Sequence, residues 1–342
     1  MERLRIVSMA GGALLALLAV GPCQAADPVA DFYAKKTVNL IIGSGEGGLY
    51  DTAGRVIAQH LKRFIPGSPT IVPQNMAGAS SVRATEYLFN VAPRDGTALA
   101  FVQPTVVLNR VLDPQAKYDP RQFFWVGRLQ PMVFVGIAWQ GAPAQTIEEA
   151  KRKPLILAAN APTGAAAMVP WALNQLVGTK FTVIRGYESE TANMLALQRG
   201  EVHGIGSMTL ADLLEKHWIE QKMASLLYTI APARAPQVPD TPTIVELAKN
   251  DADRAVLRLL ADPSAIGQTV MGPPGLPADR RAALRAAFAA MMKDKDFIAD
   301  AHKRLLDVDL LSGPELEKLV AENFSVPPDL VQKLKDVTAP PR

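Results

Sequence analysis

Short apolar runs alternate with amphipathic segments between residues 38 and 102. The apolar runs predict strands at Val38–Ile42, Thr70–Val72 and Ala98–Val102. Between them, apolar residues at helical spacing predict helices at Thr52–Phe64 and Ser80–Asn90. This β-α-β-α-β order is typical of a parallel sheet with helices on both faces, and such sheets bind ligands at the carboxyl ends of their strands.

A second series of strands and helices follows further along the chain. Its predicted strands are Phe134–Ala138, Leu155–Ala159, Phe181–Ile184, Val202–Ile205 and Ser225–Thr229. Its predicted helices are Gly164–Val177 and Glu188–Gln198, followed towards the C-terminus by Ala278–Met292, Asp296–Leu306, Gly313–Asn323 and Pro328–Val337. The two series together predict two α/β lobes.

We expect the chain to cross between the lobes twice, near Leu129 and near Ala265. Residues 27–128 and 265–342 then form lobe one, and residues 129–264 form lobe two. Two crossings make a hinge, and the cleft between two lobes is a preferred place for a small ligand.

The N-terminus has the pattern of a secretory signal peptide. Arg3 and Arg5 precede an uncharged, mostly apolar run from Met9 to Val20, and a small-residue pair follows at Ala25-Ala26. The run is shorter than the roughly 20 apolar residues that a membrane span needs. We expect a signal peptide at residues 1–25, with cleavage after the first alanine of the pair or else after the second, and a periplasmic location. A membrane anchor or a buried helix is the alternative.

The chain contains a single cysteine, Cys23. Removal of the signal peptide leaves the mature chain without a thiol, which excludes disulfides, thiolate metal sites and thiol nucleophiles. Lipidation of Cys23 is the alternative, but Pro22 stands where lipoprotein signals have a small, flexible residue.

Composition and charge are those of an ordinary globular protein, with 49% hydrophobic and 20% charged residues. The formal net charge of +3 becomes +2 in the mature chain, because Glu2, Arg3 and Arg5 together carry +1. The sequence has no run of lysines and arginines that would indicate nucleic-acid binding.

A glycine-rich loop, Gly43–Gly48, joins the first predicted strand to the first predicted helix. Its glycines match the G-x-G-x-x-G fingerprint of dinucleotide-binding units. Such a unit also needs an acidic residue after the second strand, and here that strand runs into Pro73-Gln74-Asn75. No Lys-Ser or Lys-Thr pair follows the glycines, as a Walker motif would require. We therefore favour a smaller anion over a nucleotide and expect no cofactor.

A strand-to-helix loop suits a small anion because its free N–H groups and the helix dipole point at one place. The residues that can offer such groups are Gly47, Gly48, Leu49 and Tyr50. A second loop, Asn75–Ser81, and a third, Asn160–Gly164, have the same strand-to-helix context. Each loop alone is better explained by an ordinary turn with glycine at a positive φ. Taken together, the three loops predict one ligand site between the lobes.

Two acidic residues complicate this first loop. Asp51 lies near the predicted helix start, which favours a helix-capping role, with binding of a ligand amine or an ordered water as the alternative. Glu46 lies inside the loop, where its charge should repel an anion unless it points outward or the ligand carries a donor there.

The sequence offers no recognisable catalytic set. The histidines lack H-E-x-x-H or other paired spacing, so we expect no metal site. There is no G-x-S-x-G elbow, and the serines near the predicted loops have no evident base. We therefore expect a binding protein and not an enzyme. Candidates for lining the cleft from lobe two are Trp171, Arg185 and Tyr187.

Six segments of the mature chain share the pattern of one family of receptors. They are Val38–Asp51, Asn75–Ser81, Ala92–Leu99, Gln198–Val202, Pro239–Leu247 and Gly272–Pro277. Together they resemble the extracytoplasmic solute-binding proteins of tripartite tricarboxylate transporters, the Bug or TctC-like family. The resemblance implies a periplasmic-binding-protein-like fold whose two α/β lobes close on a small organic carboxylate. It also implies membrane permease subunits as partners.

The resemblance further implies which residues bind the ligand. In the family the first two loops hold one carboxylate through backbone N–H groups and ordered water, and lobe two tunes specificity. The implied residues here are Gly47, Gly48, Asp51, Gly78 and Ala79, less directly Leu49, Tyr50 and Ser80, and in lobe two Thr163, Gly164 and Tyr187.

The chain departs from the family pattern within these loops. Leu49-Tyr50 stand in place of a small hydroxyl residue, and Glu46 replaces a small residue. The second loop ends in Ser80-Ser81 instead of two glycines, and residues 163–168 lack the usual serine and histidine. These changes make a citrate-like tricarboxylate a poor fit.

The side chains near the loops favour a different ligand. Tyr50, Met168 and Tyr187 suggest a monocarboxylate with an apolar or aromatic body. Two other functions stay open as alternatives: a receptor that reports ligand occupancy to a sensor kinase, and an enzyme of the cell envelope.

Overall fold

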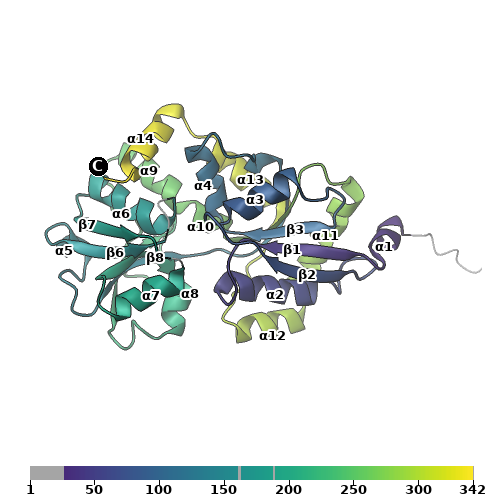
Figure 1. Ribbon diagram of the computed structural model, residues 1–342, viewed down its shortest axis with the longest axis horizontal. Coiled ribbons are helices and arrows are strands. Elements are labelled where there is room, and N and C mark those ends of the chain that lie inside the picture. Colours follow the sequence, from purple (N-terminus) through teal and green to yellow (C-terminus); the bar gives the residue numbers. More distant parts are fainter. Residues whose placement is uncertain (1–26, 161–162, 188, 342) are drawn as a thin grey trace, which may run out of the picture.

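The computed structural model describes residues 27–160, 163–187 and 189–341. It has two α/β lobes side by side, each built on its own sheet (Figure 1). The expected signal peptide at 1–25, Cys23 and the expected cleavage positions lie outside the described residues. So do Glu188, the predicted first residue of a helix, and positions 161–162 of the third loop.

The first sheet has six strands in the order β11-β4-β10-β3-β1-β2. Their bounds are β1 (Thr37–Ile42), β2 (Thr70–Asn75), β3 (Ala98–Val102), β4 (Phe124–Gln130), β10 (Gln268–Gly272) and β11 (Leu311–Ser312). Strand β1 pairs in parallel with β2 and with β3, as the β-α-β-α-β order predicted. Strand β10 runs antiparallel to β3 and β4, so the other half of this sheet is mixed.

The sequence analysis did not predict β4 and β10. All seven residues of β4 are buried, but polar residues interrupt its apolar run. Arg128 is accommodated because its guanidinium donates to the Ala265 carbonyl at 2.6 Å and pairs with Asp309 at 3.0 Å. Gln130 is satisfied by donating to Gln268 of β10 at 2.9 Å. These partners are distant in sequence, so the local pattern does not indicate a buried strand.

The second sheet has five strands in the order β7-β6-β8-β5-β9. Their bounds are β5 (Phe134–Trp139), β6 (Leu155–Ala159), β7 (Phe181–Arg185), β8 (Gly204–Thr209) and β9 (Ala224–Ile230). All five overlap predicted strands, although β8 begins two residues later and ends four residues later than the predicted Val202–Ile205. Strand β6 pairs in parallel with β7 and β8, whereas β5 is antiparallel to β8 and β9. The short link from Gln130 to Phe134 connects the two sheets directly.

Helices cover both faces of each sheet (Figure 1). On the first sheet, α3 (Val82–Asn90), α4 (Thr105–Leu112) and α13 (Gly313–Phe324) lie on one face, and α2 (Leu49–Leu61), α11 (Ala278–Met291) and α12 (Lys295–Lys303) on the other. On the second, α6 (Ala165–Leu176), α9 (Asp251–Ala261) and α14 (Pro328–Thr338) lie opposite α7 (Glu190–Gln198) and α8 (Leu210–Glu215). Shorter helices are α1 (Pro28–Tyr33), α5 (Ile147–Ala150), α10 (Pro263–Ile266) and a 3-10 turn at Pro120–Gln122.

Two helices at the sheet edge begin at other residues than predicted. Helix α2 starts at Leu49, three residues before the predicted Thr52, because Gly48 is extended and serves as its N-cap. Helix α3 starts at Val82, because Ser80 and Ser81 before it have positive φ angles of 50° and 71°. Both shifts follow from backbone conformations that apolar periodicity does not reveal.

The C-terminal helix departs from the predicted division of the chain, which assigns all of 265–342 to lobe one. Leu334 and Val337 of α14 are buried in the core that α6 and α9 form in the second lobe. Lys333 also pairs with Asp253 of α9 at 2.8 Å. The apolar face of this amphipathic helix thus finds its partner on the second lobe.

Candidate functional site

The first glycine loop lies at the carboxyl edge of β1, between β1 and α2. The N–H of Gly43 donates to the Phe101 carbonyl at 2.9 Å, which fixes the start of the loop on β3. Gly47 has a φ of 79°, a conformation that favours glycine. A Cβ added to Gly45 or Gly48 would meet no described atom within 4 Å. The outer side of the loop therefore borders open space, where a ligand could approach the backbone closely.

The second loop lies beside the first and has an unusual backbone. Gly78, Ala79, Ser80 and Ser81 all have positive φ angles, from 44° to 142°. For residues other than glycine, left-handed backbone costs roughly 1–2 kcal/mol each. The buried Ser81 holds this turn: its hydroxyl donates to the Gly43 carbonyl at 2.8 Å and accepts from the Gln103 N–H at 3.1 Å. One side chain thus locks the two predicted binding loops together.

Asp51 stabilises the first loop through hydrogen bonds to its buried side chain. Its buried carboxylate accepts hydrogen bonds from the Gly47 N–H, Arg55 Nε and Asn75 Nδ2, each at 2.9 Å. Burial disfavours the charged form, but the hydrogen bonds from Arg55, Gly47 and Asn75 outweigh it and lower the pKa of Asp51 below its usual range. The N-cap of α2 is Gly48, so Asp51 is an anchor for the loop and not the predicted cap.

Tyr50 is a core residue of the first lobe. Its ring packs on Phe101 with centroids 5.3 Å apart, and its hydroxyl donates to Met132 Sδ at 3.0 Å. Met168 is likewise buried in the core of the second lobe. Of the three side chains that suggested an aromatic or apolar ligand body, Tyr50 and Met168 are buried and Tyr187 is partly exposed. Tyr50 instead joins α2 to the link between the sheets.

In the second lobe the predicted residues lie on two neighbouring loops, because β6 and β7 are adjacent strands. Thr163 is exposed, and Gly164 is the N-cap of α6. The side chain of Asn193 on α7 donates to that of Asn160, and the Gly186 N–H donates to the Asn160 carbonyl at 3.3 Å. These bonds connect the loop that holds Thr163 and Gly164 to the loop that leads to Tyr187.

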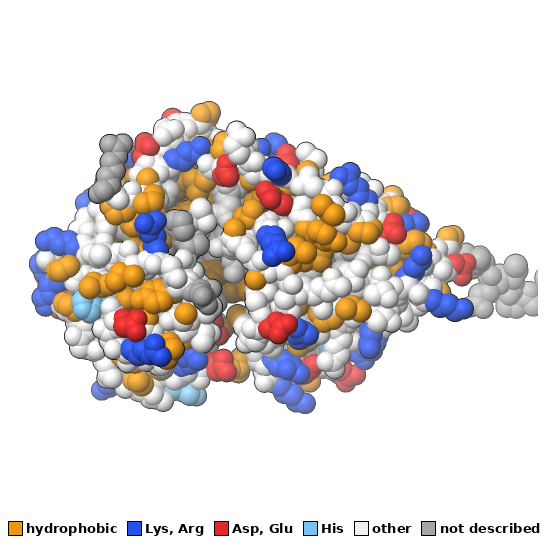
Figure 2. Space-filling model, in the orientation of Figure 1, with side chains coloured by type: hydrophobic (Ala, Val, Ile, Leu, Met, Phe, Trp, Pro, Cys, Tyr) orange, Lys and Arg blue, Asp and Glu red, His pale blue; other side chains and the backbone are white. Residues whose placement is uncertain are grey.

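The molecular surface is hollowed between the two lobes (Figure 2). The structure brings the loops of Gly47 and Gly48 and of Gly78 and Ala79 together on the first lobe, since β1 and β2 are parallel neighbours. Thr163, Gly164 and Tyr187 belong to the corresponding strand ends of the second lobe. The predicted residues therefore lie on strand-end loops of both lobes.

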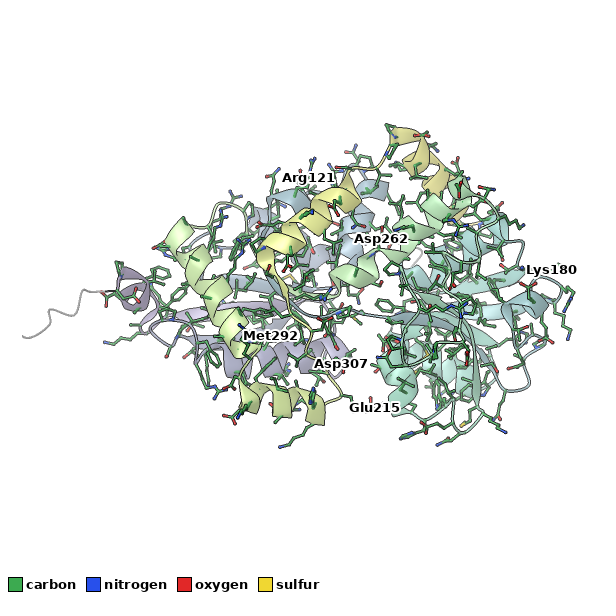
Figure 3. The ribbon with its side chains drawn as sticks, turned by 180° about the vertical axis from the view of Figure 1, so that it is seen from behind. Arg121, Lys180, Glu215, Asp262, Met292 and Asp307 are labelled. Carbon is green, nitrogen blue, oxygen red and sulfur yellow. The ribbon has the colours of Figure 1, made fainter. Side chains whose placement is uncertain are left out.

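A cavity of about 640 Å³ also lies between the lobes, next to the link Gln130–Val133. Of the predicted residues that the structure describes, Leu49 lines it and the glycines do not. Glu215 of α8 and Asp307, which follows α12, lie on either side of the gap when it is seen from behind (Figure 3). Because both are acidic and most of the wall is apolar, this cavity suits a carboxylate less well than the N–H groups of the glycine loops.

The sequence analysis gave no role to several residues that shape the site. Asn75 ties β2 to the first loop by donating to Asp51 and to the Ser44 carbonyl. Ser81 was considered only as a nucleophile and as a replacement for a glycine of the family pattern. Glu190, the first residue of α7, accepts from the Thr209 N–H at 3.3 Å and was not singled out at all. A polar residue at the end of a strand was the available signal for Asn75, whereas Ser81 and Glu190 acquire their partners only through the fold.

Other site types are absent from the part of the chain that the structure describes. There, no cluster of three or more His, Cys, Asp or Glu side chains could hold a metal ion. None of the helices described is both long and apolar enough to cross a bilayer.

Known proteins resemble this chain in sequence and fold. No protein-family model matches it. A relative in Cupriavidus necator, the UPF0065 protein in gbd 5'region, is 29% identical over 259 residues, which cover 72% of this chain and 75% of the relative. The periplasmic binding protein BugD superposes with a TM-score of 0.67 at 18% identity, over 89% of this chain and 98% of its own. This chain has the fold of BugD.

Two further structures share the BugD-like fold, both from Rhodopseudomonas palustris. One was solved with adipate and has a TM-score of 0.66 at 19% identity, covering 89% of this chain and 97% of its own. The other, MatC with bound malate, has a TM-score of 0.65 at 20% identity, covering 89% and 99%. The expected resemblance to Bug and TctC-like receptors, and the expected periplasmic-binding-protein-like architecture of two α/β lobes, are thus confirmed at the level of the fold.

Proposed function

We propose that this protein is an extracytoplasmic solute-binding protein that captures a small organic carboxylate between its lobes. The observation that carries the proposal is the bond from Ser81 Oγ to the Gly43 carbonyl at 2.8 Å, which locks two strand-to-helix loops side by side. A side chain added at Gly47 or Gly48 would enter open space, so the backbone of the first loop is accessible, and backbone N–H groups at helix starts favour anions. BugD-like proteins solved with adipate and malate support a carboxylate as the anion.

The ligand carboxylate would lie on the N–H groups of Gly48, Gly78 and Ala79, beside Gly47, whose own N–H is donated to Asp51. Leu49, Ser80 and the lobe-two residues Thr163, Gly164 and Tyr187 would surround the rest of the ligand. Asp51 would act indirectly, since its carboxylate is already occupied by Gly47, Arg55 and Asn75. Closure of the lobes would bend the segments that connect them, which are the link from Gln130 to Phe134, the stretch before β10 and the stretch between α13 and α14. Binding would be the whole reaction, with no chemical turnover.

A periplasmic location and membrane permease subunits as partners are part of the same proposal. Both follow from the resemblance to receptors of tripartite transporters. Cleavage of residues 1–25 would release the two lobes into the periplasm, where a ligand-loaded closed form could be delivered to a permease.

A thermal-shift screen tests the proposal. A panel of benzoate, malate, adipate and citrate is added to the purified mature protein, and a binder raises the melting temperature through mass action. The matched variant is Gly48→Ser, since Gly48 has an ordinary φ of −92° at an N-cap position that serine suits well. We expect Gly48→Ser to fold normally and to lose at least about tenfold in affinity, because its side chain enters the anion site. Absence of stabilisation by every acid would overturn the proposal.

A further inference from the structure

Glu190 occupies the edge of the second lobe that faces the first. It is the first residue of α7, directly after the N-cap Ser189, and so lies at the strand-end edge of the second sheet. Its carboxylate accepts the Thr209 N–H at 3.3 Å, which ties it to the end of β8. Thr209 itself lines the cavity between the lobes. This carboxyl is therefore held at the junction of the lobes by two elements of lobe two.

The charge of Glu190 also affects a residue of the first lobe, Tyr50. Burial raises the pKa of the Tyr50 hydroxyl, and the charge of Glu190 raises it further. Tyr50 belongs to the first turn of α2, directly after Leu49. Leu49 and Thr209 line the same cavity between the lobes, so the start of α2 and the strand end that is bonded to Glu190 border one space.

The groups that face Glu190 disfavour its charge. Burial raises the pKa of Glu190 to about 7, and the nearby Asp212 of α8 acts in the same direction. The Thr209 N–H and Lys216 oppose these effects, and the Tyr50 hydroxyl is neutral at any physiological pH. Asp212 accepts a hydrogen bond from the Thr209 hydroxyl, so Thr209 is bonded to both acids.

We propose that Glu190 is a ligand-selecting residue of lobe two, which takes up a proton when an organic acid binds and then donates a hydrogen bond to the far end of that acid. The inference rests on the proposed function above. A bound anion adds negative charge near Glu190 and Asp212, and lobe closure removes water from Glu190; both changes favour the neutral carboxyl. A neutral carboxyl is a hydrogen-bond donor, so the site would select acids with a carboxylate, carbonyl or hydroxyl at that end.

Calorimetry from pH 5.5 to 8.5 tests this inference, with adipate and malate as probes, in two buffers of different ionisation enthalpy. We expect affinity for the wild type to fall by up to about tenfold per pH unit above pH 7, with close to one proton taken up per ligand bound. Glu190→Gln, which keeps a donor but cannot titrate, should bind with no such pH dependence. Glu215→Gln, which changes an exposed acid on α8, should retain the wild-type profile.

The outcomes separate the two proposals. If neither acid binds the wild type at any pH, the proposed function fails and this inference fails with it. If an acid binds with the same pH profile in wild type and Glu190→Gln, only the role of Glu190 is overturned. Proton release with affinity that rises above pH 7 would also overturn it, because Glu190 would then be ionised, and not a hydrogen-bond donor, when adipate or malate is bound.

Discussion

The hydroxyl of Ser81 donates to the carbonyl of Gly43 at 2.8 Å, across a sequence separation of 38 residues. The bond joins the end of β1 to the left-handed turn before α3. A Cβ on Gly43 would lie 2.5 Å from the same hydroxyl, so the two residues are matched in size as well as in hydrogen bonding. This pair sets the relative position of the two loops that we propose hold the ligand carboxylate.

Ser81→Ala should destabilise the protein and weaken ligand binding together. The substitution leaves the Gly43 carbonyl and the Gln103 N–H without their buried partner, at a cost of about 1–3 kcal/mol in the free energy of unfolding. Urea denaturation measures the stability and calorimetry the affinity. Ser80→Ala is the control for the stability measurement, because Ser80 is partly exposed, and it should change stability by less than about 0.5 kcal/mol. An equal loss of stability in the two variants would show that Ser81 does not hold the loops.

Asp51→Asn should destabilise the fold at neutral pH and less so in acid. Its three donors lose a charged acceptor, with a cost of roughly 2 kcal/mol at pH 7. Because the folded-state pKa of Asp51 lies below its ordinary value of 3.8, the stabilisation is present above pH 3.8 and disappears as pH falls through the folded pKa. Urea midpoints at pH 7 and pH 3 test this. A difference between wild type and variant that grows towards acid would contradict it.

Gly47→Ala should cost about 1 kcal/mol in stability, because alanine is strained at a φ of 79°. Gly45→Ala is the matched control: its Cβ also enters open space, and its φ is not in the left-handed region. We expect the control to retain wild-type stability within about 0.5 kcal/mol in urea denaturation. If both variants lost the same stability, backbone strain at Gly47 would not be the cause.

Glu190→Gln should become more stable than the wild type as pH rises. In the ligand-free protein the pKa of Glu190 is raised from 4.5 to about 7, so the unfolded chain ionises first. Wild-type stability therefore falls between pH 4.5 and 7, by up to roughly 3 kcal/mol from this group, and then levels off. Glu190→Gln has no carboxyl at this position, so its stability does not fall for this reason. Denaturation curves at pH 4.5, 6 and 8 measure the difference, and a constant difference across these pH values would show that Glu190 titrates normally.

Much of the secondary structure could be predicted from the sequence. Strands such as Ala98–Val102 and Leu155–Ala159 agree with the observed bounds, because they are continuous apolar runs buried on both faces. The predicted loops around Gly47 and Gly78 follow from glycine between a strand and a helix. By contrast, β4 could not be predicted, since its buried Arg128 and Gln130 are stabilised by Asp309 and Gln268 from the far end of the chain.

The sequence by itself determined the two α/β series, their order and the glycine loops at the strand ends, because these depend on local periodicity and on backbone freedom. Only the tertiary structure decided what each polar side chain does. In the folded structure the Ser81 hydroxyl bonds to the Gly43 carbonyl, and the Asp51 carboxylate accepts the Gly47 N–H. The buried Tyr50 donates to Met132, and Glu190 accepts the Thr209 N–H. The physical reason is that hydrogen bonding and desolvation depend on neighbours in space, and these neighbours lie 4 to 82 residues apart in the chain.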